Sequence, residues 1–176
     1  GQNCSAASRA YIPQSVWNRI EATYVEEVGK ITMGDVADFS NFIGAVIDKK
    51  SFDNITGYID RAHADAGCTI VTGGNYDGST GFFVEPTTIV CSDPMYESMQ
   101  EEIFGPVLSI HVYEDSKFEE ILTICDSTSE YALTGSIFAT NREDIETAKD
   151  ALRFSAGNFY INDKPTGAVV GQQPFG

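Results

Sequence analysis

Apolar residues recur at helical spacing in several stretches of the chain. A broad apolar face predicts a helix over residues 14–28, and Gly29 follows as its stop. The most regular pattern predicts a second helix, which is followed by Gly67. Its apolar residues lie three and four positions apart: Phe52, Ile55, Ile59, Ala62 and Ala66.

Capping residues predict two further helices. Ser116 and Glu119 have the spacing of a capping box, in which two side chains satisfy the free N–H groups of a helix start. Asn141 is expected to cap the last helix, whose inward-facing residues are Ile145, Ala148 and Leu152.

Short β-rich runs alternate with these helices. They cover residues 9–12, 69–72, 82–84, 87–91, 107–112, 135–139 and 158–161. Strands that alternate with amphipathic helices predict an α/β fold, a layered domain with a largely parallel sheet flanked by helices. No internal repeat or linker divides the chain, so we expect one domain over residues 1–176.

Charge is the unusual feature of the composition. Hydrophobic residues make up 42% of the chain, as in an ordinary globular protein, but 11 basic and 26 acidic side chains give a net charge of −15. This charge repels phosphate backbones and acidic membrane surfaces, so we expect no nucleic acid and no membrane among the partners. No apolar run has membrane-spanning length.

The cysteines do not have the spacing of a metal site. Cys4, Cys68, Cys91 and Cys125 form no C-x-x-C pair, and the two histidines are not beside them in sequence. We therefore expect no metal, and free thiols in a reducing compartment.

Cys4 lies among glycine, serine and alanine residues in the segment Gly1–Ser8. Small neighbours would let a substrate approach the sulfur and would leave backbone N–H groups free to face a developing charge. If a helical turn begins there, its dipole would favour the thiolate over the thiol. On these residues alone two interpretations stay open, a catalytic nucleophile or a small buried thiol between a strand and a helix.

A second candidate site precedes the strand at residues 107–112. A glutamate held by the rigid Gly105–Pro106 turn could accept both hydroxyls of a ribose, and Phe104 could cover a nicotinamide ring. The alternative is a solvated acidic pair, Glu101 and Glu102, beside one core phenylalanine.

Glycines punctuate a third candidate stretch, residues 166–176. Gly167 and Ala168 would let a ligand carboxylate reach their backbone N–H groups, as in an anion-binding nest. Phe175 could cover the aliphatic part of the same ligand. An ordinary surface loop would have the same composition.

Together the three stretches resemble the aldehyde dehydrogenase superfamily. Gly1–Cys4 with the following Ser8–Arg9 is similar to its nucleophile motif, residues 101–107 to its cofactor-facing motif, and residues 131–138 to a core segment. Residues 157–164 and 166–176 are similar to hallmark segments of one subfamily, the pyrroline-5-carboxylate dehydrogenases of proline catabolism. The resemblance covers essentially the whole chain.

The resemblance implies an enzyme that oxidises a small-molecule aldehyde, L-glutamate gamma-semialdehyde, to L-glutamate. The thiolate of Cys4 would attack the aldehyde carbon, giving a thiohemiacetal and then a thioester. NAD is the implied cofactor, with Glu102 on the nicotinamide ribose and Phe104 against the ring.

The resemblance also assigns the substrate-binding residues. Gly167 and Ala168 would bind the α-carboxylate, Ser5 would lie beside the reacting end, and Phe175 would pack against the chain between them.

Parts of such an enzyme are missing from these residues. The NAD-binding domain, the general-base glutamate, the asparagine of the oxyanion hole and the C-terminal oligomerisation strand would lie outside them. We therefore expect an excised piece, a partial catalytic domain over residues 1–176 without turnover of its own. The intact enzyme would be a homo-oligomer, located in the mitochondrial matrix if eukaryotic and otherwise in the cytoplasm.

Two alternatives to this function stay open. The chain could belong to another aldehyde dehydrogenase with a different acid-bearing substrate. It could also be a non-catalytic binding or structural piece.

Overall fold

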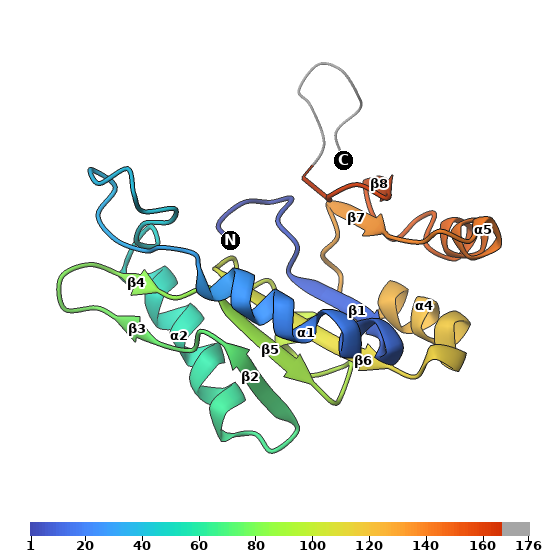
Figure 1. The fold of residues 1–176 in the computed structure, drawn as a ribbon, viewed down its shortest axis with the longest axis horizontal. Coiled ribbons are helices and arrows are strands. Elements are labelled where there is room, and N and C mark those ends of the chain that lie inside the picture. Colours follow the sequence, from blue (N-terminus) through green and yellow to red (C-terminus); the bar gives the residue numbers. More distant parts are fainter. Residues whose placement is uncertain (167–176) are drawn as a thin grey trace.

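A four-stranded sheet forms the centre of the molecule (Figure 1). The computed structural model describes residues 1–166. Across the sheet the strands follow the order β1 (Arg9–Pro13), β6 (Val107–Tyr113), β5 (Thr87–Cys91) and β2 (Cys68–Thr72). Strand β6 is parallel to both β1 and β5, whereas β2 is antiparallel to β5. The predicted sheet, largely parallel, is confirmed, with one antiparallel strand at its edge.

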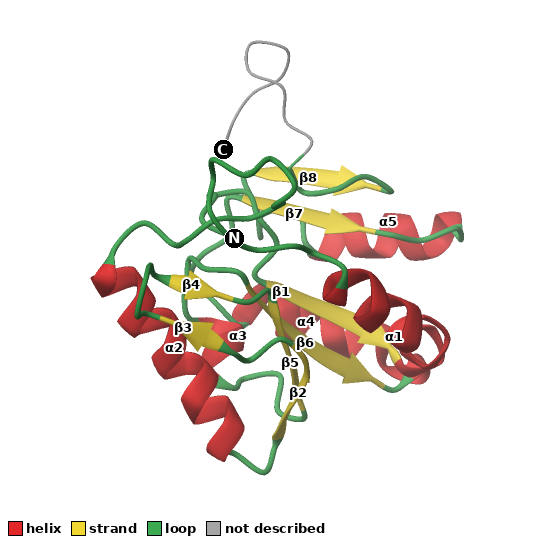
Figure 2. Ribbon diagram, turned by 60° about the vertical axis from the view of Figure 1, so that its left-hand side comes forward, coloured by secondary structure: helices red, strands yellow, loops and turns green. Residues whose placement is uncertain are grey.

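Helices cover both faces of this sheet. Thr88 and Ile89 are consecutive in β5 and therefore point to opposite faces. The Tyr24 hydroxyl of helix α1 (Gln14–Gly29) lies 2.6 Å from Thr88 Oγ1, whereas helix α2 (Lys49–Ala64) contributes Ile55 to the core that contains Ile89. Figure 2 shows the sheet between α1 and α2. The layered α/β architecture expected from the sequence is confirmed.

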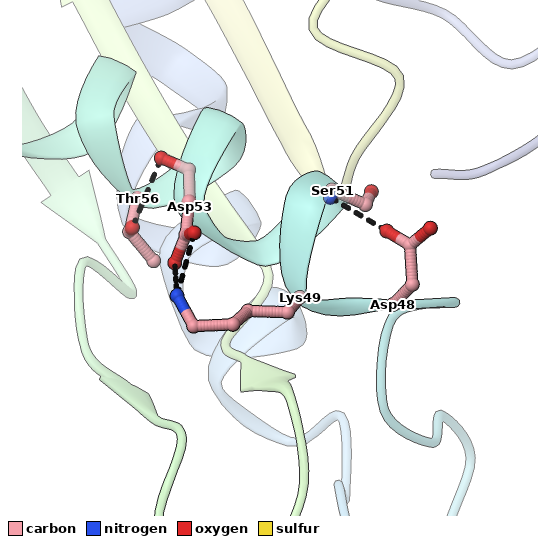
Figure 3. Close-up of polar contacts among 5 residues, drawn as sticks. All are labelled: Asp48, Lys49, Ser51, Asp53 and Thr56. Atoms are coloured by element: carbon pink, nitrogen blue, oxygen red, sulfur yellow. Dashed lines mark hydrogen bonds and ion pairs between the residues drawn. The ribbon is translucent and has the colours of Figure 1, made fainter.

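The periodicity of α2 accounts for its burial, and its first turn accounts for where it begins. Ile55, Ile59 and Ala62 are almost completely buried, as their spacing predicts. Asp48 caps the helix by accepting a hydrogen bond from the Ser51 N–H at 2.7 Å (Figure 3). The helix ends at Ala64, so the prediction that Ala66 belongs to it is wrong.

The remaining elements flank the sheet. They are the short helix α3 (Glu97–Gln100), the antiparallel pair β3 (Tyr76–Asp77) and β4 (Phe83–Val84), helices α4 (Phe118–Ser127) and α5 (Arg142–Ala151), and the parallel pair β7 (Thr134–Ile137) and β8 (Asn158–Ile161). Leu122 of α4 packs with Ala148 and Leu152 in a second apolar cluster. Asn141 caps α5 as predicted, through the Glu143 N–H. In the described part of the chain, no helix is both long and apolar enough to cross a bilayer.

The predicted capping box at Ser116 and Glu119 is wrong. A 3-10 helix over Asp115–Lys117 leads into α4, whose N-cap residue makes no side-chain hydrogen bond. The Asp115 carboxylate instead accepts hydrogen bonds from the N–H, at 3.0 Å, and from the hydroxyl of Ser15. Asp115 therefore satisfies the first turn of α1, which has no side-chain cap of its own.

Candidate active site

The sheet brings the first two candidate segments to the same edge. Residues 1–8 lead into β1 and residues 101–106 lead into β6, its parallel neighbour. Two parallel neighbours begin at the same edge, and the Ser109 N–H of β6 donates to the Ser8 carbonyl at 3.0 Å. The two segments are therefore adjacent although about a hundred positions separate them in sequence.

The backbones of these segments run close to each other at Gly1 and Gly105. A Cβ placed on Gly1 would lie 3.5 Å from the carbonyl carbon of Gly105 and 3.5 Å from the nitrogen of Pro106, which is ordinary van der Waals contact. Gly1 is three residues from Cys4, and Gly105 directly follows Phe104. The candidate nucleophile and the candidate cofactor residues thus lie in neighbouring loops.

Cys4 lies in a tight turn and not at the start of a helix. The Asn3 N–H bonds the Gly1 carbonyl at 2.9 Å, and the Ala6 N–H bonds the Asn3 carbonyl at 3.0 Å. The Asn3 side-chain oxygen also accepts from the N–H and the hydroxyl of Ser5, both at 3.0 Å. Within residues 1–166 the Cys4 N–H has no acceptor, so it is free to donate to a bound group.

Exposure separates Cys4 from the other three thiols. All four cysteines are free, and only the Cys4 side chain is exposed. Burial raises the pKa of the Cys68 and Cys125 thiols, and it raises the pKa of Cys91 to about 12. These three groups therefore stay protonated near neutral pH. The interpretation of Cys4 as a small buried thiol is wrong.

The residues that follow Glu101 alternate between solvent and core. Ile103 is 6% exposed and enters the core next to α2, whereas Glu102 and Phe104 are exposed. Phe104 has a φ of +54°, a left-handed conformation that is rare for a bulky residue. Phe104 is 40% exposed, so the alternative of a core phenylalanine is wrong. The core residue of the motif is Ile103.

The carboxylates of the motif are solvated. Glu101 and Glu102 are both exposed, and in the described part of the chain the Glu102 carboxylate has no hydrogen-bond donor. Its two oxygens can accept two hydroxyl groups of a ligand.

Ser5 contacts the β7–β8 pair. Its carbonyl accepts a hydrogen bond from the Thr134 hydroxyl at 3.4 Å. Thr134 is the first residue of β7 and pairs with Asn158 of β8. Residues 1–8 therefore contact the β7–β8 pair and lead into the central sheet, and the β7–β8 pair lies apart from that sheet in both ribbon views (Figures 1 and 2). The substrate-binding residues expected at Gly167, Ala168 and Phe175 lie outside the described residues.

Gln2 is a structural part of the site that sequence reasoning missed. Its Nε2 donates to the Ser51 hydroxyl at 2.7 Å, and its Oε1 accepts from the Ile47 N–H at 2.9 Å. These partners are 49 and 45 positions away, and no local pattern in the sequence indicates the contact.

Known proteins match the chain over its whole length. Residues 1–176 match the model of the aldehyde dehydrogenase family. Over the full chain the sequence is 64% identical to the mitochondrial delta-1-pyrroline-5-carboxylate dehydrogenase of Dictyostelium discoideum and 50% identical to that of Homo sapiens, covering 32% and 31% of those proteins. The crystal structure of the Mycobacterium tuberculosis delta-pyrroline-5-carboxylate dehydrogenase bound with NAD superposes with a TM-score of 0.91 at 49% identity, covering 100% of this chain and 32% of that one. The chain thus spans about a third of the length of the curated relatives that it matches.

Proposed function

Because the chain belongs to the aldehyde dehydrogenase family, we propose that it forms part of the catalytic domain of an NAD-dependent dehydrogenase. The proposed reaction is the oxidation of L-glutamate gamma-semialdehyde to L-glutamate in proline catabolism, in line with the names of relatives up to 64% identical. One observation of the structure carries the proposal: the exposed Cys4 turn lies against the loop that presents Glu102 and Phe104.

Cys4 is the nucleophile of this proposal. Its thiolate attacks the aldehyde carbon, a C–S bond forms, and the carbonyl oxygen becomes an oxyanion. The Cys4 N–H, which has no acceptor within residues 1–166, can donate a hydrogen bond to that oxygen. Oxidation of the adduct leaves a thioester, and attack by water releases the carboxylic acid and restores the thiol. The base that activates this water would lie outside residues 1–176.

The loop before β6 fits a nicotinamide nucleotide. Glu102 offers an exposed carboxylate with two acceptor oxygens for the ribose, and Phe104 offers an exposed flat ring for the nicotinamide. When bound, NAD supplies the hydride acceptor of the oxidation.

Four residues would hold the substrate. In this proposal Ser5 lies beside the reacting end, Gly167 and Ala168 bind the α-carboxylate through their N–H groups, and Phe175 packs against the aliphatic chain. The intact enzyme is proposed to be a homo-oligomer. Its proposed location is the mitochondrial matrix if the source is eukaryotic, in line with the Dictyostelium and human relatives, which are named as mitochondrial, and otherwise the cytoplasm.

The test uses a chimera in which this chain replaces the matching third of the Dictyostelium relative. We expect the chimera to form NADH from glutamate semialdehyde and residues 1–176 alone to form none. Cys4→Ala should abolish the reaction, whereas Cys68→Ser, at a thiol remote from the proposed chemistry, should not. A folded chimera without activity would contradict the function, and an isolated chain as active as the chimera would contradict the partial domain.

A variant of the same chimera tests the substrate. Gly167→Val should raise the KM for glutamate semialdehyde, because a side chain there would obstruct the proposed carboxylate site. An unchanged KM would favour a different acid-bearing aldehyde.

A further inference from the structure

The first turns of α2 contact both loops of the proposed site. Ser51 accepts the hydrogen bond from Gln2, two residues before Cys4. Ile55 lies under Gly105, directly after Phe104. Ser51 and Ile55 are four positions apart and therefore lie one turn apart on one face of the helix.

On the nucleophile side, the contact consists of two hydrogen bonds made by the side-chain amide of Gln2. Gln2 donates to the Ser51 hydroxyl and accepts from the Ile47 N–H, so both ends of its side chain are held. Asp48 satisfies the backbone N–H of Ser51 and leaves the Ser51 hydroxyl available to Gln2 (Figure 3). The start of α2 thus restrains the Cys4 turn through the side chain of Gln2.

On the cofactor side, the contact is close packing. A Cβ on Gly105 would lie 2.6 Å from both Cδ1 and Cγ1 of Ile55, closer than real side chains approach. Ile55 is completely buried and cannot yield easily. The Pro106 carbonyl accepts from the Thr87 N–H at 2.8 Å, which holds the loop from the side of β5.

We propose that Ser51 and Ile55 are positioning residues, and that α2 is the common platform that holds the Cys4 turn and the Glu102–Phe104 loop relative to each other. In this proposal each of them acts through a loop residue that it contacts, Ser51 through Gln2 and Ile55 through Gly105. The inference rests on the proposed function, since it concerns the separation of nucleophile and hydride acceptor. Displacement of a reacting group by about 1 Å can lower a rate by about a hundredfold.

Kinetics of the chimera separate the two contacts. Ser51→Ala should lower kcat by about tenfold to a hundredfold and leave the KM for NAD unchanged, because it frees the Cys4 turn alone. Ser51→Thr keeps the hydroxyl and should restore most of the rate. Gly105→Ala should raise the KM for NAD by about tenfold, and adding Ile55→Val, which removes the crowded Cδ1, should reverse part of this rise.

Asp53→Asn is the matched control. Asp53 pairs with Lys49 on the exposed side of the same helix and contacts neither loop (Figure 3). We expect its kinetic constants to stay within about twofold of the parent, since exposed ion pairs contribute little.

Hydrogen exchange supplies a readout that does not depend on activity. Exchange over residues 1–6 should rise in Ser51→Ala and not in Asp53→Asn. Unchanged exchange in Ser51→Ala would overturn the proposal that α2 is the platform. Equal kinetic effects of Ser51→Ala and Asp53→Asn would overturn it as well. An inactive parent chimera would instead count against the proposed function, and the exchange measurement would still decide the positioning role.

Discussion

The close approach of Gly105 to Ile55 makes a quantitative prediction about stability. A Cβ at position 105 would meet two carbons of Ile55 at 2.6 Å, so Gly105→Ala forces a shift in a closed core. Overpacking of this kind costs about 1–3 kcal/mol. Ile55→Val alone should cost about 0.5–1.5 kcal/mol through the lost methyl group.

The two substitutions should not be additive. Valine lacks Cδ1, one of the two crowded atoms, so the double variant should be about 1 kcal/mol more stable than the sum of the single effects predicts. The assay is urea unfolding of residues 1–176, monitored by the fluorescence of Trp17. This is the single tryptophan, and it is 5% exposed. Gly29→Ala is the control, because nothing lies within 4 Å of a Cβ at that position. We expect it to be neutral or stabilising by up to about 1 kcal/mol.

The refuting result is additivity. If the double variant equals the sum within about 0.5 kcal/mol, the contact between α2 and the loop does not hold in solution. A Gly105→Ala variant as stable as Gly29→Ala would refute the steric reasoning directly.

Two further predictions concern titrating groups. Iodoacetamide at pH 8 should alkylate Cys4 first and Cys91 last, because Cys91 is 1% exposed and burial raises its pKa to about 12. Peptide mass spectrometry measures the labelling of each cysteine. Labelling of Cys91 as fast as that of Cys4 would contradict the proposed site. Hydrogen bonds from Ser15 hold the pKa of the Asp115 carboxyl below its usual value. The contribution of the Asp115 carboxylate to folding stability is therefore complete above the unfolded-state pKa of about 3.9. It is lost as the pH falls through the lower folded-state pKa. Asp115→Asn should therefore lower the urea midpoint more at pH 7 than at acid pH, and an equal decrease at both would show that Asp115 does not act through its charge.

Local patterns predicted most of the elements and failed where a residue has a distant partner. The three-and-four spacing around Ile55 and Ile59 predicts a buried helix face, and both residues are buried. Ser116 and Glu119 have the spacing of a capping box, yet a 3-10 turn occupies that position. The neighbouring Asp115 bonds Ser15, 100 positions away, and the spacing of nearby residues carries no information about such a partner.

The sequence by itself indicated the chemistry that is available, a cysteine among small residues and a glutamate and a phenylalanine before a rigid turn. It also indicated the order of the longer helices and most strands, but not the short strand β3. These depend on residue type and short-range periodicity, which are properties of the chain alone. Only the tertiary structure decided that β1 pairs with β6, that Phe104 turns to solvent while Ile103 enters the core, and that α2 touches both loops. Strand pairing and close packing join residues far apart in sequence, and many pairings are compatible with the same local pattern.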